Sequence, residues 1–547
     1  MPKRKAVASL SSLCLGNVAQ HMQSVWVRDY SENYLDEYHF RYIMGPFNEL
    51  ASCLVQDLLR LLGESRRLTR AMLHLLLVPH LTALNLRTCP GLVSNAITQL
   101  IAVRCKNLSC LELSGCSRVP AAALVELAEG LPGLTKLGLA ETQANTQVLA
   151  AVGACCRRLR ELDISHCQKV APGSLLHLAY DPTESVWCCP ALRVLLARGI
   201  EPQGPGQDLL GALAFLLLAL PSLEFLANSH LPEALCLIHT RQIHGPPPAV
   251  GFPSLEALAQ SRLGPHAAGG NSWLTLPLRR AEEVEGPFLA TFCSVCPEVA
   301  EVAVFLGDDP APGWGSLAWS RLTQLTVNCT GRRERGLAEM LPVVQGLGAR
   351  LQSLSLHGFS FDNEFSFCAL LNCCPNLCAF SSHLSVPTMP PQPAPAVPNG
   401  EPAAEPQGWE LDMLCHPLLK LRHFSLGLAS SPAPLPRQHT AVLGASLAYL
   451  LSRAHSLETV ALLSIPFSLD GVFQRALAAP STTLPNLREL SLAESQVSSL
   501  TVHSLLALDN GLRSLNLAGC PAIHRRDYDQ LLRVVRKECL ELDIRWQ

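Results

Sequence analysis

Apolar residues recur along the chain in the pattern Leu-x-x-Leu-x-Leu-x-x-Cys. The clearest copies begin at Leu81, Leu108, Leu159 and Leu512 and end at Cys89, Cys116, Cys167 and Cys520. Degenerate copies begin at Leu134, Leu192, Leu223, Leu322, Leu351, Leu421, Leu457 and Leu487, and weaker ones at Leu255, Val299 and Leu377. The starts at 81, 108, 134 and 159 lie 25 to 27 residues apart, a spacing typical of leucine-rich repeats.

Each copy predicts one short strand followed by one helix. Apolar and polar residues alternate over the strand, and a helical stretch such as residues 121–128 then places Leu124 and Leu127 on one face. A single strand and helix cannot bury their apolar faces, whereas stacked copies can. The pattern therefore predicts an α/β leucine-rich-repeat solenoid, a curved horseshoe with parallel strands on the concave face and helices outside.

The cysteine that ends the motif resembles the cysteine-containing repeat subtype, which is common in F-box leucine-rich-repeat proteins and in antagonists of mitotic exit. The resemblance covers roughly residues 81 to 547. It implies a fold and leaves the function open, because one fold carries many functions.

Two stretches interrupt the period. Residues 384–408 are rich in proline, which favours extended, unpaired backbone, so we expect a disordered loop extruded from one repeat. Residues 245–275 contain three consecutive prolines and the pair Gly269-Gly270, and they predict a second, shorter interruption. We expect a small N-terminal helical region at residues 1–65 and a solenoid at residues 66–547.

The composition restricts the class of partner. Apolar residues make up 48% of the chain and charged residues 16%, with a formal net charge of -3, so no basic field favours nucleic acid or anionic membranes. The longest apolar run, residues 209–220, is too short to span a bilayer, and the basic start lacks a signal-peptide core. We expect a cytoplasmic or nuclear protein whose 22 cysteines are reduced core thiols.

Cys293 and Cys296 have the spacing of a redox or zinc pair. The repeat offers a structural explanation, because a cysteine also stands three residues before the next strand's first leucine at Cys105, Cys156, Cys189 and Cys374. No second ligand pair follows, and the 18 histidines form no catalytic or metal-binding motif. We therefore expect neither an enzyme nor a bound metal or cofactor.

The inner wall of the solenoid is the predicted binding surface. Side chains that flank the buried leucines of a strand point away from the core, and here they mix polar groups with both signs of charge, which suits a protein ligand. A merely solvated surface is the alternative for each position. The candidate substrate-binding residues are Asn85, Arg87, Glu112, Ser114, Lys136, Glu161, Asp163, Gln324, Asn328 and His357, with Thr326 and Ser355 beside them.

Residues 9–18 read SLSSLCLGNV and precede the repeats. On a helix Leu10, Cys14 and Val18 form one narrow apolar stripe, with Leu13 beside it. The segment resembles the BC box of elongin-binding proteins: Ser, Thr or Pro, then Leu, three residues, Cys, three residues and an aliphatic. The resemblance implies that Leu10 enters a pocket on elongin C and that Cys14 permits close approach. The alternative is an amphipathic helix that only caps the first repeat.

Receptors with a BC box usually carry a cullin-selecting box downstream, built on an aliphatic residue, a proline, two residues and another aliphatic. The nearest candidate is MGPFNEL at residues 44–50, within a degenerate box at residues 43–62 in which Pro46 and Leu50 would contact the adaptor complex. Gly45 replaces an aliphatic and Leu50 comes one residue late, which leaves the choice of cullin open. The same segment also resembles a decayed F-box.

The resemblance favours a substrate-recognition subunit of a cullin-RING ubiquitin ligase. Its partners would be elongin C, elongin B, a cullin with its RING subunit and an unknown protein substrate, and it would act by raising local concentration. Two alternatives stay open: a repeat scaffold or inhibitor whose N-terminal helices only cap the solenoid, and an F-box-type receptor.

Overall fold

A computed structural model describes residues 2, 9–29, 46–202, 204, 207–243, 248–263, 274–308, 319–361, 364–385, 418–429, 437–478 and 484–546. The chain divides into two compact units. The N-terminal unit comprises residues 8–281 and 290–299, and the C-terminal unit comprises residues 1–7, 282–289 and 300–547.

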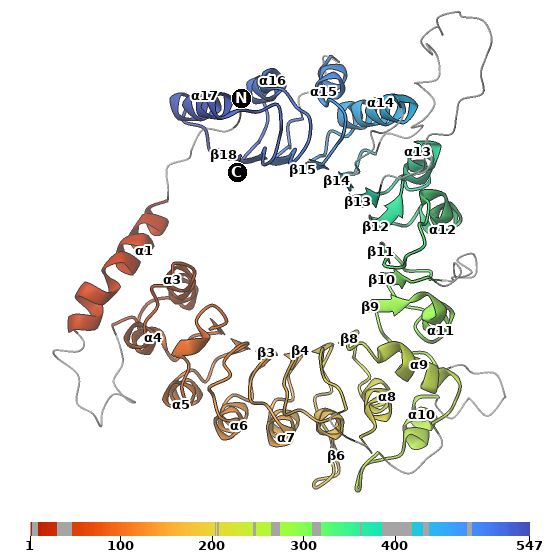
Figure 1. The fold of residues 1–547 in the computed structure, drawn as a ribbon. Helices are drawn as coiled ribbons and strands as arrows, with labels where there is room; N and C mark the ends of the chain where they lie inside the picture. Colours follow the sequence, from red (N-terminus) through yellow and green to blue (C-terminus); the bar gives the residue numbers. More distant parts are fainter. Residues whose placement is uncertain are drawn as a thin grey trace, which may run out of the picture. The chain divides into compact units, whose positions relative to one another are not determined.

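The described part of the N-terminal unit contains a six-stranded parallel sheet whose strand order follows the chain (Figure 1). Its strands are β1 (Ala83–Asn85), β2 (Cys110–Glu112), β3 (Lys136–Gly138), β4 (Glu161–Asp163), β7 (Val194–Leu196) and β8 (Phe225–Ala227). Their central leucines pair in register and are all buried. Truncating one such leucine typically costs about 2–5 kcal/mol, so this row holds the repeats together.

Helices follow the strands of this unit, and those up to residue 239 pack on one another in chain order. They are α5 (Asn95–Arg104), α6 (Ala121–Gly130), α7 (Thr146–Cys155), the 3₁₀ helix η3 (Pro172–Leu178), α8 (Leu209–Ala219), α9 (Leu231–His239) and α10 (Leu255–Leu263), preceded by the 3₁₀ turn η2 (Pro90–Leu92). A hairpin of β5 (Tyr180–Asp181) and β6 (Val186–Trp187) is inserted after η3. α11 (Leu289–Val295) spans the boundary between the units.

The N-terminal region precedes this array. Its described part contains α1 (Leu10–His21), the π-helical turn η1 (Met22–Val27), α3 (Ser52–Glu64) and α4 (Arg70–Leu76). Residues 30–45 lie outside the described residues. The expected domain boundary at residue 65 stays a prediction.

α10 lies inside the predicted interruption at residues 245–275 and packs against α8. Arg262 donates from Nε to the carbonyl of Leu218 at 2.8 Å and from its terminal nitrogen to Leu217 at 3.0 Å and Leu220 at 2.8 Å. Helix C-termini leave such carbonyls without helical partners, so this arginine caps α8. Burial lowers the pKa of Arg262. Residues 244–247 and 264–273 of the region are outside the described residues.

The C-terminal unit carries most of a ten-stranded parallel sheet, again in chain order within the described residues. Its strands are β9 (Arg280–Glu285), β10 (Glu301–Leu306), β11 (Gln324–Cys329), β12 (Ser353–Ser360), β13 (Ala379–Ser385), β14 (His423–Leu428), β15 (Thr459–Leu463), β16 (Glu489–Ser491), β17 (Ser514–Asn516) and β18 (Asp543–Arg545). The rings of Phe380 and Phe424 stack at 5.7 Å in its core.

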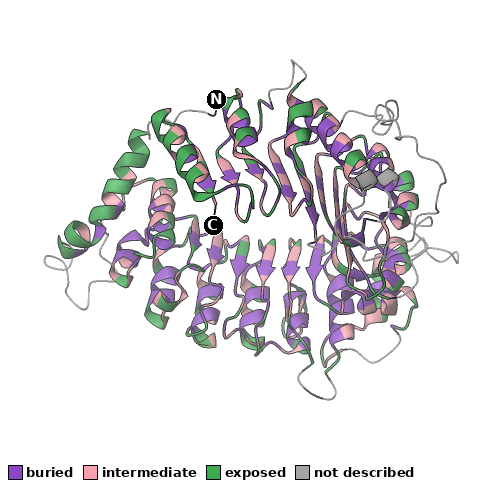
Figure 2. Ribbon diagram, turned by 45° about the horizontal axis from the view of Figure 1, so that its top comes forward, coloured by how far each residue is buried: buried purple, intermediate pink, exposed green. Residues whose placement is uncertain are grey.

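The helices in the described part of this unit are α12 (Leu341–Leu347), α13 (Glu364–Asn372), α14 (Arg437–Arg453), α15 (Asp470–Leu477), α16 (Ser499–Ala507) and α17 (Arg525–Lys537), with 3₁₀ turns η5 (Gly286–Phe288) and η7 (Leu337–Met340). Purple buried positions follow the strands and one side of the helices, and green exposed positions follow the other side (Figure 2). The predicted α/β leucine-rich-repeat solenoid is confirmed. Among the described residues, no helix combines the length and apolar character needed to cross a bilayer.

Most predicted repeat starts stand two residues before a strand, as Leu81 does before β1 and Leu457 before β15. The prediction at Leu255 is wrong, because this residue begins α10. The strand of that repeat is β9, which begins two residues after the buried Leu278. Leu255 belongs instead to the helical part, where Leu258 and Ala259 are buried.

The predicted loop at residues 384–408 lies outside the described residues except at its start. Leu384 and Ser385 belong to β13, and Leu384 is fully buried. β13 and β14 pair directly, from Ala379 with His423 to Leu384 with Leu428. The insertion therefore begins later than the sequence pattern indicated.

Deleting residues 388–408 should leave the melting temperature nearly unchanged, because shortening the loop that the sequence predicts there changes closure entropy only slightly. Deleting residues 384–408 should lower the melting temperature by several degrees, since it also removes buried Leu384, worth about 2–5 kcal/mol. Differential scanning calorimetry of both variants tests this pair. A large loss in the shorter deletion would show that the proline-rich segment packs on the fold.

Asp470 joins two consecutive repeats. Its carboxylate accepts hydrogen bonds from the backbone N–H and the hydroxyl of Ser498, at 3.0 and 2.9 Å, and from the hydroxyls of Thr501 at 2.5 Å and Ser468 at 3.2 Å. Ser498 is the N-cap of α16. Burial alone would raise the pKa of Asp470, but these hydrogen bonds outweigh it and lower the pKa.

We expect Asp470→Asn to destabilise the protein by about 1–3 kcal/mol at pH 7, because it replaces charge-assisted hydrogen bonds. A carboxylate whose folded pKa is depressed stabilises above its unfolded pKa of about 3.9, and this contribution disappears as pH falls through the folded pKa. Urea denaturation from pH 7 to pH 3 should thus show the two proteins converging at low pH. A difference that stays constant would contradict this role.

Candidate protein-binding surfaces

α1 begins where the BC-box resemblance places its first residue. Ser9 is the N-cap, and its hydroxyl accepts the backbone N–H of Ser12 at 3.1 Å. This capping is worth about 1 kcal/mol. The Ser-Leu pair that opens the motif therefore also starts the helix.

One face of α1 packs against the fold. Ala19 and Met22 are buried, Leu15 is half-buried, and the helix contacts α3. A guanidinium nitrogen of Arg67 donates to the carbonyl of Gln20 at 3.0 Å, and the ring of Trp26 lies 5.3 Å from that of Phe47. These contacts engage the C-terminal half of α1 and η1.

The predicted stripe lies largely on the other face of α1. Leu10 is 78% exposed and Leu13 is 56% exposed, and Cys14 is exposed as well. At 100° per residue these three side chains fall within about 100° of one another, and Leu15, Ala19 and Met22 face away from them. α1 is drawn mostly as exposed in Figure 2.

Val18 departs from the predicted stripe, because it is half-buried beside the packed face. The sequence pattern missed Val25 of η1, which is 50% exposed and apolar. Its signal was the apolar run Val25-Trp26-Val27 that follows the box. The exposed apolar stripe of α1 thus comprises Leu10, Leu13 and Cys14, and Val25 is a separate exposed apolar residue of η1.

α3 covers the first repeat. It contacts β1, and its Val55, Leu58 and Leu62 are buried. The Gln56 amide donates to the hydroxyl of Thr82 at 2.8 Å, just before β1. A solenoid end requires such a cap, and α3 meets that requirement.

The predicted adaptor residues Pro46 and Leu50 lie in a turn before α3. Pro46 is exposed and Leu50 is half-buried, and the Leu50 carbonyl lies 2.6 Å from Nε2 of His80. Met44 and Gly45 of the degenerate box are outside the described residues. Leu50 is therefore tied to the solenoid through its backbone, while Pro46 is open to solvent.

On the inner wall of the N-terminal unit, several side chains hydrogen-bond to the backbone of the turn that follows their own strand. Asn85 accepts the N–H of Arg87 at 3.0 Å, and Asp163 accepts that of Ser165 at 2.9 Å. Glu112 in the same register position accepts from the N–H of Ser114 at 3.2 Å and from its hydroxyl. These three side chains close the turn after each strand, which is a structural role.

Two other candidates of this wall pair with each other. Nζ of Lys136 lies 2.6 Å from a carboxylate oxygen of Glu161 on the next strand. This hydrogen bond is the main cause that raises the pKa of Lys136. Both groups are about half exposed, so the pair contributes at most about 1 kcal/mol. It remains accessible to a partner.

Arg87 and Ser114 occupy equivalent positions after β1 and β2. Arg87 is exposed, as expected. Ser114 is buried and does not face a partner, against the expectation, because its hydroxyl donates to Glu112. The short Ser114 side chain lies against the wall because it hydrogen-bonds to Glu112 of its own strand, whereas the long Arg87 side chain extends into solvent.

The inner wall of the C-terminal unit is richer in small hydroxyl groups. The register places Thr326, Ser355, Ser381 and Ser425 in one row across β11 to β14. Gln324 is exposed, and Asn328 and His357 are half-buried on flanking rows. Ser381 and Ser425 were missed because their repeats, starting at Leu377 and Leu421, are degenerate.

His357 pairs in register with His383, another residue missed from the sequence. Burial lowers the pKa of His357, and the neighbouring His383 lowers it further. The imidazole of His383 fills the space beside Gly427, where an added Cβ would collide with Nδ1. This wall is therefore polar, and the lowered pKa of His357 favours its neutral form.

The repeat cysteines serve the core. Sγ of Cys167 donates to the carbonyl of Leu139 at 3.0 Å, and Sγ of Cys520 donates to Leu492 at 3.0 Å, in each case to the preceding repeat. Burial raises the pKa of Cys116 to about 12. The described cysteines are free thiols, and protonated buried thiols are unreactive.

Cys296 is buried and burial raises its pKa, while Cys293 is half-buried. Within the described ranges, no group of three or more His, Cys, Asp or Glu side chains could hold a metal ion. The Cys-x-x-Cys spacing thus gains no further ligands from the described part of the fold.

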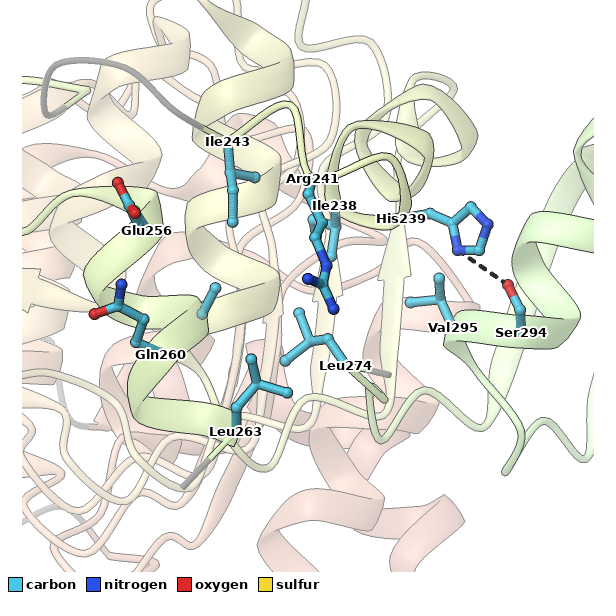
Figure 3. A pocket seen from close by; sticks show the side chains of 11 residues that line it. Ile238, His239, Arg241, Ile243, Glu256, Gln260, Leu263, Leu274, Ser294 and Val295 are labelled. Carbon is cyan, nitrogen blue, oxygen red and sulfur yellow. Dashed lines mark hydrogen bonds between the residues drawn. The ribbon is translucent and has the colours of Figure 1, made fainter. Parts of the chain in front are cut away.

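A cavity of about 200 Å³ lies between α9, α10 and α11 (Figure 3). Its lining is mainly apolar, with His239, Arg241, Glu256, Gln260 and Ser294 among the polar side chains. Nδ1 of His239 lies 3.2 Å from the hydroxyl of Ser294, a geometry that invites comparison with a nucleophile and its base. However, the Thr291 carbonyl also lies 2.9 Å from that hydroxyl, so a backbone acceptor competes with the imidazole for its single proton.

No protein-family model and no curated protein matches this chain. Among solved structures, it is similar to a chain in the crystal structure of the Rad7 and Elc1 complex from yeast, with 13% identity, a TM-score of 0.38, and coverage of 95% of this chain and 96% of that chain. It is also similar to the leucine-rich repeat-containing protein LegL7 from Legionella pneumophila, with 14% identity, a TM-score of 0.29, and coverage of 56% and 84%. At these TM-scores neither likeness bears on function.

Proposed function

We propose that this protein is a non-enzymatic substrate receptor of a cullin-RING ubiquitin ligase, in which α1 binds elongin C and the inner walls of the repeats bind a protein substrate. The observation that carries the proposal is the exposure of Leu10, Leu13 and Cys14 on a capped helix. Exposed apolar side chains that gather on one face are typical of interaction sites.

The alternative role of α1 as a solenoid cap predicts a different arrangement. A capping helix would turn its stripe toward the first repeat and bury it. Here α3 covers that repeat, and α1 contacts α3 through a face that excludes Leu10 and Cys14. The stripe is therefore not needed to cover the array, which supports a partner for it.

The BC-box resemblance favours elongin C as the partner of this stripe. In that family a leucine enters a pocket on elongin C and a small cysteine allows the helix to approach, and Leu10 and Cys14 hold these positions. Helix-in-groove recognition uses anchors at such i and i+4 positions. Elongin B and a cullin with its RING subunit would follow as further members of the complex.

The substrate would meet a polar wall in either unit. Arg87 and the Lys136–Glu161 pair are accessible in the N-terminal unit, and Gln324 is accessible in the C-terminal unit. Polar surfaces of this kind suit a protein ligand. The receptor would act by proximity: it raises the effective concentration of substrate lysines near a ubiquitin-loaded enzyme and needs no reactive group of its own.

Affinity purification of the tagged full-length chain from cells tests the proposal. We expect a cullin, its RING subunit and elongins B and C to co-purify with the wild type, and the same cullin to be absent when Leu10 is changed to Ser. Pro46→Ala should retain the elongins while weakening the cullin. Recovery of the protein without any cullin, or with a cullin adaptor of the F-box type, would refute the elongin proposal.

A further inference from the structure

The last helix of the solenoid, α17, carries a strongly basic face. Arg525, Arg526, Arg533, Arg536 and Lys537 are all exposed. At 100° per residue the five side chains fall within about 120° of one face, along a helix about 18 Å long. Asp529 is the only carboxylate on that face.

These cations are not used by the fold. None of the five side chains forms an ion pair or side-chain hydrogen bond with the described part of the chain. The other acidic residue of α17, Asp527, is occupied at the helix start, where it accepts the N–H of His524 at 3.0 Å. The basic face is therefore free to meet an anion.

The remaining side of α17 is attached to the last strand. Leu531 is fully buried, and the rings of Tyr528 and Trp546 stack at 5.3 Å. The indole N–H of Trp546 donates to the carbonyl of Ile523 at 3.1 Å. The backbone of α17 is thus fixed by packing before a partner binds, which reduces the entropy cost of binding.

The residues around α17 disfavour a membrane, single-stranded nucleic acid and a nucleic-acid duplex as the anionic partner. A membrane would need the apolar side of a basic amphipathic helix, and here that side is buried in the solenoid. Single-stranded nucleic acid would need aromatic rings for base stacking, but Tyr528 and Trp546 stack on each other. A duplex would also approach the exposed Glu541 and Asp543 that follow the helix.

We propose that the basic face of α17 binds an extended, acidic segment of a partner protein. A single extended chain is narrow enough to follow one helix, and carboxylates match arginine forks in geometry and charge. The bland alternative is a polar end that merely keeps the terminal repeat soluble. Such an end needs no excess of one sign, whereas this face has five cations to one carboxylate. This site is separate from α1 and does not depend on elongin binding.

The test uses the full chain and a fluorescein-labelled 12-residue peptide of alternating Glu and Gly, measured by fluorescence anisotropy. Charge reversal at Arg526, Arg533 and Lys537 should weaken binding about thirtyfold, roughly tenfold for each 1.4 kcal/mol lost. The matched control reverses three exposed cations elsewhere, Arg118, Lys169 and Arg350, and should change affinity less than about twofold. Raising the salt from 50 to 500 mM should weaken the wild type strongly.

A variant with glutamine at Arg526, Arg533 and Lys537 should lose less affinity than the charge reversal and melt at the wild-type temperature, which separates binding from folding. Equal losses in the charge reversal and its matched control would overturn the proposal. So would the absence of peptide binding by the wild type, which would leave α17 as a solubilising end. Tighter binding of a 12-nucleotide single-stranded DNA than of the peptide would overturn the choice of partner.

Discussion

The double substitution Leu10→Ser with Cys14→Phe is expected to reduce binding to elongin C at least a hundredfold while leaving the melting temperature unchanged. Truncating a central apolar anchor typically costs an interface about 2 kcal/mol or more, and the bulky phenylalanine would obstruct close approach. A hundredfold loss corresponds to about 2.7 kcal/mol. Both side chains are exposed, so their change should not disturb the fold.

Two single variants serve as controls, one in α1 and one at the first residue of η1. Ser12 is exposed and faces away from Leu10 and Cys14, so Ser12→Glu should retain elongin C. Met22 is fully buried, so Met22→Ser should lower the melting temperature. Isothermal titration calorimetry with the elongin B–elongin C heterodimer, together with thermal melts, distinguishes these results. A folded double variant that still binds elongin C would refute the assignment of Leu10 and Cys14.

Removing the carboxylate of Glu339 is expected to destabilise the C-terminal unit by about 3 kcal/mol. Arg335 is 2% exposed, and its guanidinium donates to Glu339 at 2.9 Å and to the carbonyl of Gly307 at 3.1 Å. An arginine keeps its charge in a protein, and a buried charge that loses its counterion typically costs about 3–5 kcal/mol. Glu339 is about one-third exposed, which places the expected cost at the lower end.

This ion pair supports the inner wall. The backbone N–H of Ser360, at the end of β12, donates to the carbonyl of Arg335 at 2.8 Å, and β12 also carries His357. Urea denaturation should show a large loss for Glu339→Ala and a loss below 0.5 kcal/mol for Glu334→Ala, which changes an exposed carboxylate. Arg335→Met should cost less than Glu339→Ala, because it removes the charge and keeps an apolar side chain in place. A larger loss for Arg335→Met than for Glu339→Ala would contradict the conclusion that the buried Arg335 cation needs the Glu339 carboxylate.

The repeat fold was predictable because its strongest signal is local. The leucine that starts a copy enters the core two residues before the strand, so the strand positions follow even from degenerate copies such as those at Leu192 and Leu457. The exception at Leu255 shows the limit of this signal. An apolar residue next to proline-rich sequence fits a helix as well as a strand start, and packing on α8 decides between them.

The binding surfaces were only partly predictable. The sequence predicts an apolar stripe on α1, but it does not say which face packs on α3, and the half-buried position of Val18 depends on that contact. On the inner wall, strand alternation predicts which side chains point away from the core. It does not predict which of these side chains hydrogen-bond to their own turns. Asn85, Glu112 and Asp163 each accept the N–H of a residue two positions later, which becomes visible only from side-chain geometry. His383 was missed because its repeat lacks the leucine pattern.

The most direct test of the central claim is a titration of the purified wild-type chain with the purified elongin B–elongin C heterodimer, without cullin or substrate. A helix anchored by two apolar side chains predicts a stoichiometry of one and a dissociation constant of about 1 μM or tighter, near -8 kcal/mol. The heat should disappear when residues 9–18 are replaced by a Gly-Ser linker of equal length, while the repeats remain folded. No binding by the wild type at tens of micromolar would contradict the claim and leave α1 without an adaptor role.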